Sequence, residues 1–263
     1  MHPDTVTNAT LAFYDPDFYE WNIGEGPRLG GFYAARLAGS PGSVVEFGCG
    51  TGDILIPLVS QGRRGWGLDF SSAMLERCQQ KCLSMLPPGI SPPELICQNA
   101  LESTPTHPCD YVILANDLAG HFHSRSALLG ILRKAYAWNS EGGHILLDFP
   151  GDGPDKALEY RGASGALLHD CGRFPYSEGR SIHVWHQSRF CPDTRIITAR
   201  YRYEILSAGE SVEKIFYRSF YHRPWSVDEV VLALIAAGYP DPEVEPFGSD
   251  CGTRILIGAR RGQ

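Results

Sequence analysis

The sequence predicts an α/β protein in which a doubly wound, mostly parallel sheet carries an antiparallel β insertion in the C-terminal half of the chain. Two observations lead to this fold class. Strand-like and helix-like segments alternate between Ser43 and Phe149, which is typical of a parallel sheet with helices on both faces. After Pro150 the alternation gives way to strand-like segments joined by turn residues, which indicates antiparallel strands.

Apolar runs and helix signals place the elements of the first part of the chain. Strands are expected over 43–47, 64–70, 94–100, 110–116 and 142–149, and helices over 53–62, 71–86 and 125–140. Ser71 or Ser72 suits the N-cap of helix 71–86, and Pro87 and Pro88 would end it.

The remaining segments predict the insertion and then the end of the sheet. Alternating strand patterns lie at 181–190, 195–206 and 213–222. Ser226 is followed three residues later by Glu229, the pattern of a capping box, and Gly238 would end the helix over 226–239. The segments 242–247 and 254–261 predict a closing hairpin.

Composition narrows the class of protein. The chain has 263 residues, is 43% hydrophobic and carries a net charge of −7, which argues against nonspecific binding to nucleic acid or to a membrane surface. The opening stretch "MHPDTVTNATLAFYD" has no secretory signal pattern, and no run approaches the ~18 apolar residues of a membrane span. The eight cysteines contain no Cys-x-x-Cys pair, so we expect reduced thiols in a cytoplasmic protein and no metal site.

Three glycines at alternate positions follow the first expected strand in "VVEFGCGTGD". Gly48, Gly50 and Gly52 let the backbone take positive φ and approach a ligand closely, with N–H groups at the start of a helix. A dinucleotide fingerprint would need glycine or alanine where Asp53 stands, which disfavours a dehydrogenase.

Two acidic residues sharpen this interpretation. Asp69 ends the next expected strand, where a carboxylate can accept hydrogen bonds from two ribose hydroxyls. Glu46 stands inside a buried strand, where a carboxylate needs a polar partner. The pattern therefore predicts a site for a cofactor that contains a ribose.

On these residues the chain resembles the class I S-adenosylmethionine-dependent methyltransferases of the bacterial small-molecule type. "VVEFGCGTG" is similar to the first motif of the family and "GWGLDFSSAML" to the second. "NALEST", "DYVILANDLAGHF", "GGHILLDF" and "WSVDEVVLALIAAGY" resemble the later motifs in the same order. The resemblance covers residues 32–260 and is weakest over 155–220.

The resemblance implies S-adenosyl-L-methionine as cofactor, seven strands in the sheet, and one domain over 1–263. It further implies an N-terminal helical lid over 1–40, a cofactor-binding core over 41–150, a substrate or lid insertion over 155–222, and the end of the core over 223–263. The family usually has Asp where Asn99 stands. The implied cofactor-binding residues are Tyr14, Tyr19, Glu46, Gly48, Gly50, Gly52, Asp69, Phe70, Asn99, Ala100, Leu101 and Asn116.

The lid assignment comes from "FYDPDFYEW", which resembles a tyrosine-containing segment that covers the cofactor in this subgroup. In that comparison Tyr14 or Tyr19 would cap the methionine end of the cofactor, and either tyrosine could instead serve packing at the surface or in the core.

Methyl transfer needs alignment more than acid–base chemistry, and few residues offer a base. His121 follows the fourth expected strand and is our candidate for a catalytic base, with loop ordering as the alternative. Aromatic residues at alternate positions of the insertion could line a pocket for an aromatic or cationic methyl acceptor. The alternative is that they pack in a core or in a dimer interface. The expected substrate pocket comprises His121, Trp185, Tyr217, Tyr221 and His222.

We therefore expect a methyltransferase that acts on a small molecule, at a nitrogen of an amine or heteroaromatic ring. C-methylation of an electron-rich ring such as indole and O-methylation stay open as alternatives. The alternative from a different functional class is a protein that binds the cofactor without catalysis, as a regulatory protein or as the subunit of a partner. The expected partner is a small-molecule methyl acceptor, with no nucleic acid and no membrane, and a homodimer stays open.

Overall fold

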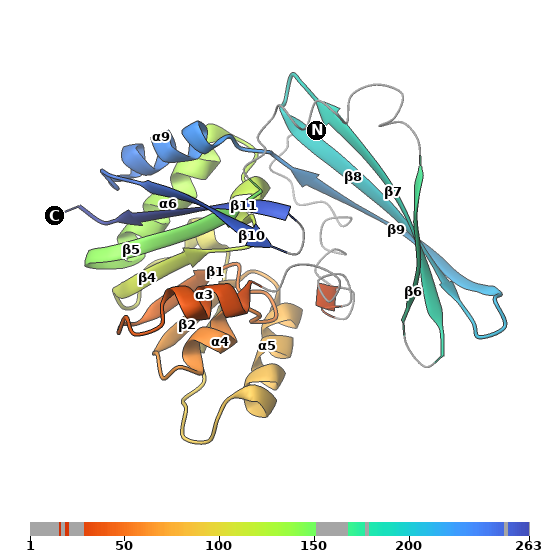
Figure 1. Cartoon of the computed structure of the whole chain (residues 1–263), viewed down its shortest axis with the longest axis horizontal. Helices are drawn as coiled ribbons and strands as arrows, with labels where there is room; N and C mark the ends of the chain where they lie inside the picture. Colours follow the sequence, from red (N-terminus) through yellow and green to blue (C-terminus); the bar gives the residue numbers. More distant parts are fainter. Residues whose placement is uncertain are drawn as a thin grey trace. The chain divides into compact units, whose positions relative to one another are not determined.

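The structure, a computed structural model, describes residues 16, 19–20, 29–150, 168–176, 179–249 and 252–262 (Figure 1). The chain forms two compact units. The described residues of the smaller unit lie within 152–224, and those of the larger unit lie within 16–151 and 225–263. The larger unit contains the glycine loop and both acidic residues that the sequence singles out.

A seven-stranded sheet forms the centre of the larger unit, in the order β10-β11-β5-β4-β1-β2-β3. Neighbouring strands are parallel except for β11, which runs antiparallel to both β5 and β10. The mostly parallel sheet and the closing hairpin are therefore confirmed. The strands are β1 (Val44–Phe47), β2 (Gly65–Asp69), β3 (Glu94–Cys97), β4 (Cys109–Leu114), β5 (Asn139–Phe149), β10 (Glu243–Ser249) and β11 (Gly252–Arg260).

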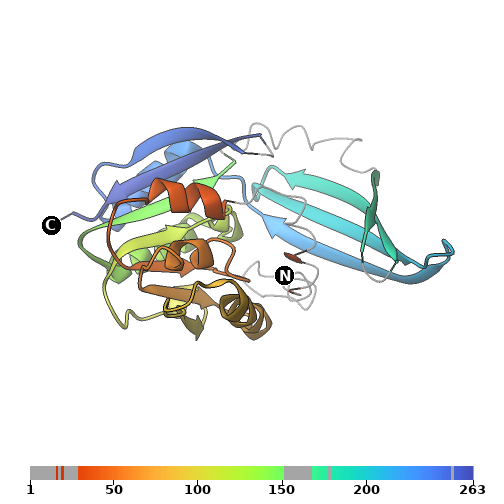
Figure 2. The ribbon, with the colours of Figure 1, turned by 60° about the horizontal axis from the view of Figure 1, so that its bottom comes forward.

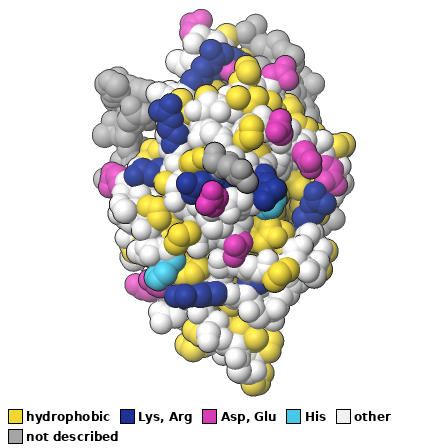
Figure 3. All heavy atoms as spheres, turned by 90° about the vertical axis from the view of Figure 1, so that its left-hand side faces the viewer, with side chains coloured by type: hydrophobic (Ala, Val, Ile, Leu, Met, Phe, Trp, Pro, Cys, Tyr) yellow, Lys and Arg dark blue, Asp and Glu magenta, His cyan; other side chains and the backbone are white. Residues whose placement is uncertain are grey.

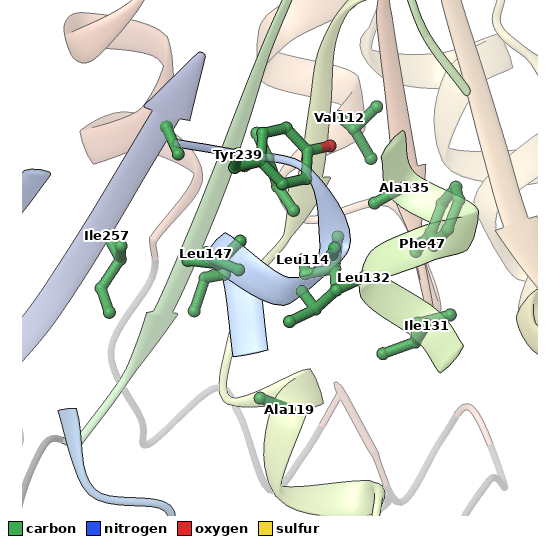
Figure 4. Packing of buried hydrophobic residues seen from close by; sticks show 14 of the residues in the cluster. Phe47, Val112, Leu114, Ala119, Ile131, Leu132, Ala135, Leu147, Tyr239 and Ile257 are labelled. Carbon is green, nitrogen blue, oxygen red and sulfur yellow. The ribbon is translucent and has the colours of Figure 1, made fainter. Parts of the chain in front are cut away.

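Successive residues of the central strands face opposite helix layers, because side chains alternate along a strand. Val45 and Val112 belong to a buried cluster that includes residues of α6 and α9, and Leu114 and Leu132 of this cluster are drawn in Figure 4. Their chain neighbours Val44 and Ile113 belong to a second cluster, with residues of α3, α4 and α5. The sheet is thus covered on both faces, as a doubly wound fold requires. The helices are α3 (Gly30–Arg36), α4 (Leu55–Val59), α5 (Ser72–Met85), α6 (Arg125–Trp138) and α9 (Val227–Ala237).

Local capping signals set the helix ends where the sequence predicts them. Ser71 is the N-cap of α5, and its side chain accepts a hydrogen bond from the Met74 N–H. Ser226 and Glu229 form the predicted capping box of α9, which ends at Gly238 with φ of 110°.

A four-stranded antiparallel sheet, in the order β6-β7-β8-β9, forms the smaller unit (Figure 2). The expected antiparallel insertion is therefore confirmed. Strand β6 is not among the expected strands, because Gly172 and Pro175 interrupt its pattern and most of its residues are exposed. The strands are β6 (His169–Pro175), β7 (Ser181–Cys191), β8 (Ile196–Leu206) and β9 (Val212–His222).

The surface carries charges of both signs. Lysine and arginine side chains are interspersed with aspartate and glutamate on the face shown in Figure 3. A hollow of about 340 Å³ lies at the end of the sheet where β5 begins and β11 ends, the opposite end from the glycine loop. Across the part of the chain that the structure describes, no helix is long and apolar enough to cross a membrane. The hollow is lined by Glu141, Gly142, Pro240, Asp241, Arg260, Arg261 and Gly262.

Candidate active site

The glycine loop follows β1 at the carboxyl end of the parallel strands, where α/β proteins bind ligands. Gly48, Gly50 and Gly52 all have positive φ, at 68°, 52° and 85°. A Cβ atom on Gly48 would lie 2.8 Å from Cδ1 of Leu118, and one on Gly52 would lie 2.6 Å from Sγ of Cys78. Both backbone conformation and space therefore require glycine at these two positions.

Asp69 ties this loop to the end of β2. Its Oδ2 accepts a hydrogen bond from the Gly50 N–H at 3.0 Å, and its Oδ1 accepts one from the Ser71 N–H at 2.9 Å. Burial raises the pKa of the Asp69 carboxyl, while these N–H groups favour its charged form. Each carboxylate oxygen has two lone pairs, so Asp69 retains acceptor capacity for a ribose hydroxyl.

Glu46 is buried within β1, with 4% of its surface exposed. It accepts a hydrogen bond from the backbone N–H of Leu55. Its Oε2 is buried and accepts no hydrogen bond from any residue that the structure describes. Burial, followed by repulsion from Asp53, raises the pKa of Glu46 well above its ordinary value. A buried carboxyl with an open acceptor requires a donor, and a cationic amino group such as that of a methionine moiety fits this requirement.

Tyr19 lies against the same loop. Its hydroxyl oxygen is 3.7 Å from the position that a Cβ atom on Gly50 would occupy, and the hydroxyl is hydrogen-bonded to the side chain of Asn116. Burial, and then the carboxyls of Asp53 and Glu46, raise its pKa, so the phenol is neutral at physiological pH. Tyr14, the other tyrosine expected at the cofactor, lies outside the described residues.

A buried ionic network holds the turn after β4. Asn116 and the next residue, Asp117, have positive φ of 53° and 60°. Two bonds to Asp148 fix this unusual backbone: the Asn116 N–H donates to Oδ1 at 2.9 Å, and the Asp117 N–H donates to the Asp148 carbonyl at 3.0 Å. Asp148 also accepts bonds from the Tyr33 hydroxyl at 2.7 Å and from Arg254 Nε at 2.8 Å.

Neither Asp148 nor Arg254 is among the site residues expected from the sequence. The available signal is a charged residue within an otherwise apolar strand, in "ILLDF" and in "RILIG". Consecutive residues in the left-handed region are strained and occur where the surrounding structure enforces them. Asp148 thus presents the side chain of Asn116 to Tyr19.

The stretch after β3 differs from the expectation that the strand runs to residue 100. The strand ends at Cys97, and residues Ala100–Glu102 form a short 3₁₀ helix, η2. The cause is local: Oδ1 of Asn99 accepts a hydrogen bond from the Leu101 N–H at 3.1 Å, which turns the chain. The Gln98 N–H donates to the Asp69 carbonyl, so this turn adjoins the end of β2. Contact of Phe70, Asn99, Ala100 and Leu101 with the cofactor stays a prediction.

His121 ends a second 3₁₀ helix, η3 (Leu118–His121), which follows β4. Its side chain is exposed, while the Trp225 indole N–H donates to the Ala119 carbonyl at 3.0 Å and anchors the turn. Leu118, at the start of the same turn, packs over Gly48. The turn that carries His121 therefore adjoins the glycine loop, and the role of His121 as a base stays a prediction.

The expected pocket residues of the insertion do not share one face of their sheet. Trp185 pairs with Arg202, which pairs with Tyr217, so these three lie in one row on one face. Tyr221 is four residues along β9 and lies on that face too, because side chains alternate with a period of two. His222 therefore lies on the opposite face.

Aromatic residues on the face of His222 pack against one another. Tyr201 stacks on His186 and on Phe220 with ring centroids 4.6 and 5.9 Å apart, and Tyr203 stacks on Phe216 at 5.0 Å. Tyr203 is 1% exposed. For this face the packing alternative explains the alternating aromatic pattern, whereas Trp185, Tyr217 and Tyr221 stay candidates for a substrate contact.

The sheet order, the glycine loop and the two acidic residues define the class I S-adenosylmethionine-dependent methyltransferase fold. Residues 44–143 match a family model described as "Methyltransferase domain". This part of the chain is therefore a methyltransferase domain, and the match together with the shared fold supports an S-adenosylmethionine-dependent enzyme. The resemblance stated from the motifs is thereby confirmed.

Solved structures share this fold over nearly the whole chain. The sugar N-methyltransferase KedS8 from Streptoalloteichus sp ATCC 53650 is 16% identical, with 95% of this chain and 93% of that chain covered and a TM-score of 0.71. DesVI from Streptomyces venezuelae is 16% identical, with 93% of this chain and 97% of that chain covered, and its TM-score is 0.70. The amino pentose methyltransferase CalS10 from Micromonospora echinaspora is 18% identical, with 99% of this chain and 100% of that chain covered, and its TM-score is 0.68.

A curated relative matches part of the chain. CymA of Salinispora arenicola, named as a probable nonribosomal peptide synthetase, is 29% identical over 109 residues, which is 41% of this chain. The matched part is 1% of the length of CymA. The activity and substrates of that whole protein therefore say nothing direct about this chain.

Proposed function

We propose that the chain transfers the methyl group of S-adenosylmethionine to a nitrogen of a small amine or heteroaromatic molecule. The observation that carries the cofactor half of this proposal is the open, buried Oε2 of Glu46 beside the glycine loop. The choice of nitrogen as methyl acceptor is supported by the reactivity of amines and by N-methyltransferases of the same fold.

The residues present fit the cofactor. Glu46 would accept from its amino group, the backbone of the glycine loop would lie under its methionine moiety, and Asp69 would accept from its ribose hydroxyls. When bound, the cofactor supplies a methyl group already activated on a sulfonium. The protein then has to hold donor and acceptor in line and to exclude water, which is worth several kcal/mol through effective concentration.

A neutral amine attacks such a methyl group without a strong base, whereas a hydroxyl benefits from one. The sugar N-methyltransferase KedS8, the amino pentose methyltransferase CalS10 and the glycopeptide N-methyltransferase MtfA have the same fold. These relatives favour nitrogen over oxygen and make amino sugars the first substrates to test. C-methylation of an electron-rich ring and O-methylation stay as alternatives.

We further place this activity in the cytoplasm. The described cysteines are free thiols, which suits a reducing compartment. The net charge of −7 supports a small-molecule acceptor over nucleic acid or an anionic membrane surface.

The test incubates the protein with S-adenosylmethionine carrying an isotopically labelled methyl group and with a panel of amino sugars, heteroaromatic amines, indoles and phenols. We expect the label on nitrogen, identified by mass spectrometry and NMR. Label on carbon or oxygen alone would replace the proposed acceptor by one of the alternatives. Tight binding of the cofactor without transfer to any panel member would favour a regulatory or partner subunit.

A further inference from the structure

Glu20 follows Tyr19 directly, and two cations of α5 hold its side chain. Its Oε2 lies 2.5 Å from Nη1 of Arg77, and its Oε1 lies 3.5 Å from Nζ of Lys81. The side chains of Glu20, Arg77 and Lys81 are 29%, 28% and 20% exposed. These ion pairs are thus partly shielded from solvent and stronger than fully exposed ones.

One of these cations, Lys81, also reaches the glycine loop. Arg77 and Lys81 are four residues apart on α5 and therefore share one face of the helix. Lys81 Nζ donates to Oδ1 of Asp53 at 2.7 Å and to Oγ1 of Thr51 at 3.3 Å. Lys81 thus binds the glycine loop through these two residues and the segment of Tyr19 through Glu20.

The charges in this group balance. Two carboxylates, of Glu20 and Asp53, face two cations, of Arg77 and Lys81. Removing the Glu20 charge would leave Lys81 paired with Asp53 but would release the chain that carries Tyr19. The hydroxyl of Tyr19 would then lose its fixed place beside Gly50 and Asn116.

We propose that Glu20 is a positioning residue, which acts through Tyr19: its ion pairs with Arg77 and Lys81 hold the Tyr19 hydroxyl against the glycine loop at the cofactor site. The inference rests on the proposed function, because it assumes that the loop holds S-adenosylmethionine. It adds a residue that neither the sequence motifs nor the pairing of strands assigns to the site.

The test measures the Kd of S-adenosylhomocysteine, the demethylated cofactor, by calorimetry for a double-mutant cycle of Glu20→Gln and Tyr19→Phe. We expect each single change to weaken binding about five- to thirtyfold, and the double variant to bind no more weakly than the weaker single variant. Glu20→Asp, which keeps the charge, should recover part of the loss. Glu76→Gln, at an exposed position on α5, is the matched control and should bind like the parent chain.

Two further readouts separate positioning from folding. Hydrogen exchange at the amides of Tyr19 and Glu20 should accelerate in Glu20→Gln without a change in the Tm of the protein. In high salt the binding advantage of the parent chain over Glu20→Gln should shrink, because ions screen the pairs.

The outcomes distinguish the inference from the function beneath it. If the parent chain does not bind S-adenosylhomocysteine, the proposed function fails. If the parent chain binds it and Glu20→Gln binds with the same Kd, only the positioning role fails. Additive losses in the cycle would also overturn the positioning role, because they would mean that Glu20 acts independently of Tyr19.

Discussion

The backbone N–H of Gly50 donates to the Asp69 carboxylate at 3.0 Å, so one side chain both shapes the glycine loop and faces the expected ribose. The interaction joins the ends of β1 and β2, which lie side by side in the sheet. Changes at Asp69 should therefore affect cofactor binding twice, through a lost acceptor and through a less ordered loop.

Asp69→Ala should weaken the binding of S-adenosylmethionine about ten- to a hundredfold, because hydrogen bonds to a charged group are worth roughly 1.5–3 kcal/mol. Asp69→Asn should lie between the parent chain and Asp69→Ala, because it keeps one acceptor oxygen. Calorimetry measures both, with exposed Asp228→Ala as control. An unchanged Kd for Asp69→Ala would remove Asp69 from the cofactor site.

Glu46→Gln should stabilise the protein without cofactor while weakening cofactor binding. The pKa of Glu46 is raised in the folded chain above its ordinary value of 4.5, chiefly by burial. The unfolded chain therefore loses this proton first as pH rises, and the contribution of Glu46 to stability falls between pH 4.5 and the raised pKa. At pH 7 the Gln variant should therefore be more stable than the parent chain and have a higher Tm.

The gain in Tm should vanish below about pH 4, where the parent Glu46 is protonated in both states. Binding of the cationic cofactor should also tighten in the parent chain as pH rises through the raised pKa of Glu46, because binding favours the charged carboxylate. In Glu46→Gln binding should not show this dependence on pH. Thermal unfolding and calorimetry across this range check both effects. A Tm for Glu46→Gln below that of the parent chain at pH 7 would contradict a buried carboxyl whose Oε2 is open.

Gly52→Ala should destabilise the chain more than Gly62→Ala, although both glycines have nearly the same φ, 85° and 86°. A Cβ atom on Gly62 meets nothing within 4 Å, whereas one on Gly52 meets Sγ of Cys78 at 2.6 Å. We expect about 1 kcal/mol at Gly62 from the backbone alone, and a further 1–3 kcal/mol or so at Gly52 from crowding. Denaturant unfolding measures the difference, which Cys78→Ala should reduce, and equal losses at the two sites would argue against crowding.

Arg254→Met should destabilise the fold by about 3–5 kcal/mol, because it leaves the buried carboxylate of Asp148 without its cation. Arg36→Met breaks an exposed ion pair, in which the side chains of Arg36 and Glu245 are 45% and 53% exposed. This change should lower the free energy of unfolding by about 1 kcal/mol or less. Adding Asp148→Asn to Arg254→Met should recover part of the loss. Urea unfolding of the set tests this, and a loss for Arg254→Met no larger than for Arg36→Met would contradict it.

His121→Ala distinguishes the acceptor atoms. Loss of a general base costs about two to four decades in rate, so a loss of that size is expected if oxygen is the acceptor. With nitrogen or carbon as acceptor, the loss should be smaller, unless His121 also holds the substrate. Single-turnover rates with the labelled cofactor measure it, with His107→Ala, at an exposed position, as control.

Local patterns in the sequence were sufficient for the order of strands and helices in the larger unit. The capping box at Ser226, the C-cap at Gly238 and the glycines after β1 each depend on residues within a few positions of one another. Such signals act over one turn, so they can be read without knowing what packs where. Strand β6 and the turn at Asn99 went against the expected pattern, because exposure and a side-chain bond outweighed strand propensity there.

The partners of the charged groups were decided only by the tertiary structure. Arg254 and Asp148 are 106 positions apart, and Arg77 and Glu20 are 57 positions apart. Their meeting depends on β11 inserting beside β5 and on Tyr19 and Glu20 lying against α5, and no local periodicity encodes either. The sequence by itself therefore determined the fold class and the place of the glycine loop. The structure decided which buried charge is paired and that Oε2 of Glu46 is open among the described residues. The physical reason is that the cost of an unpaired buried charge depends on its surroundings in three dimensions rather than on its neighbours along the chain.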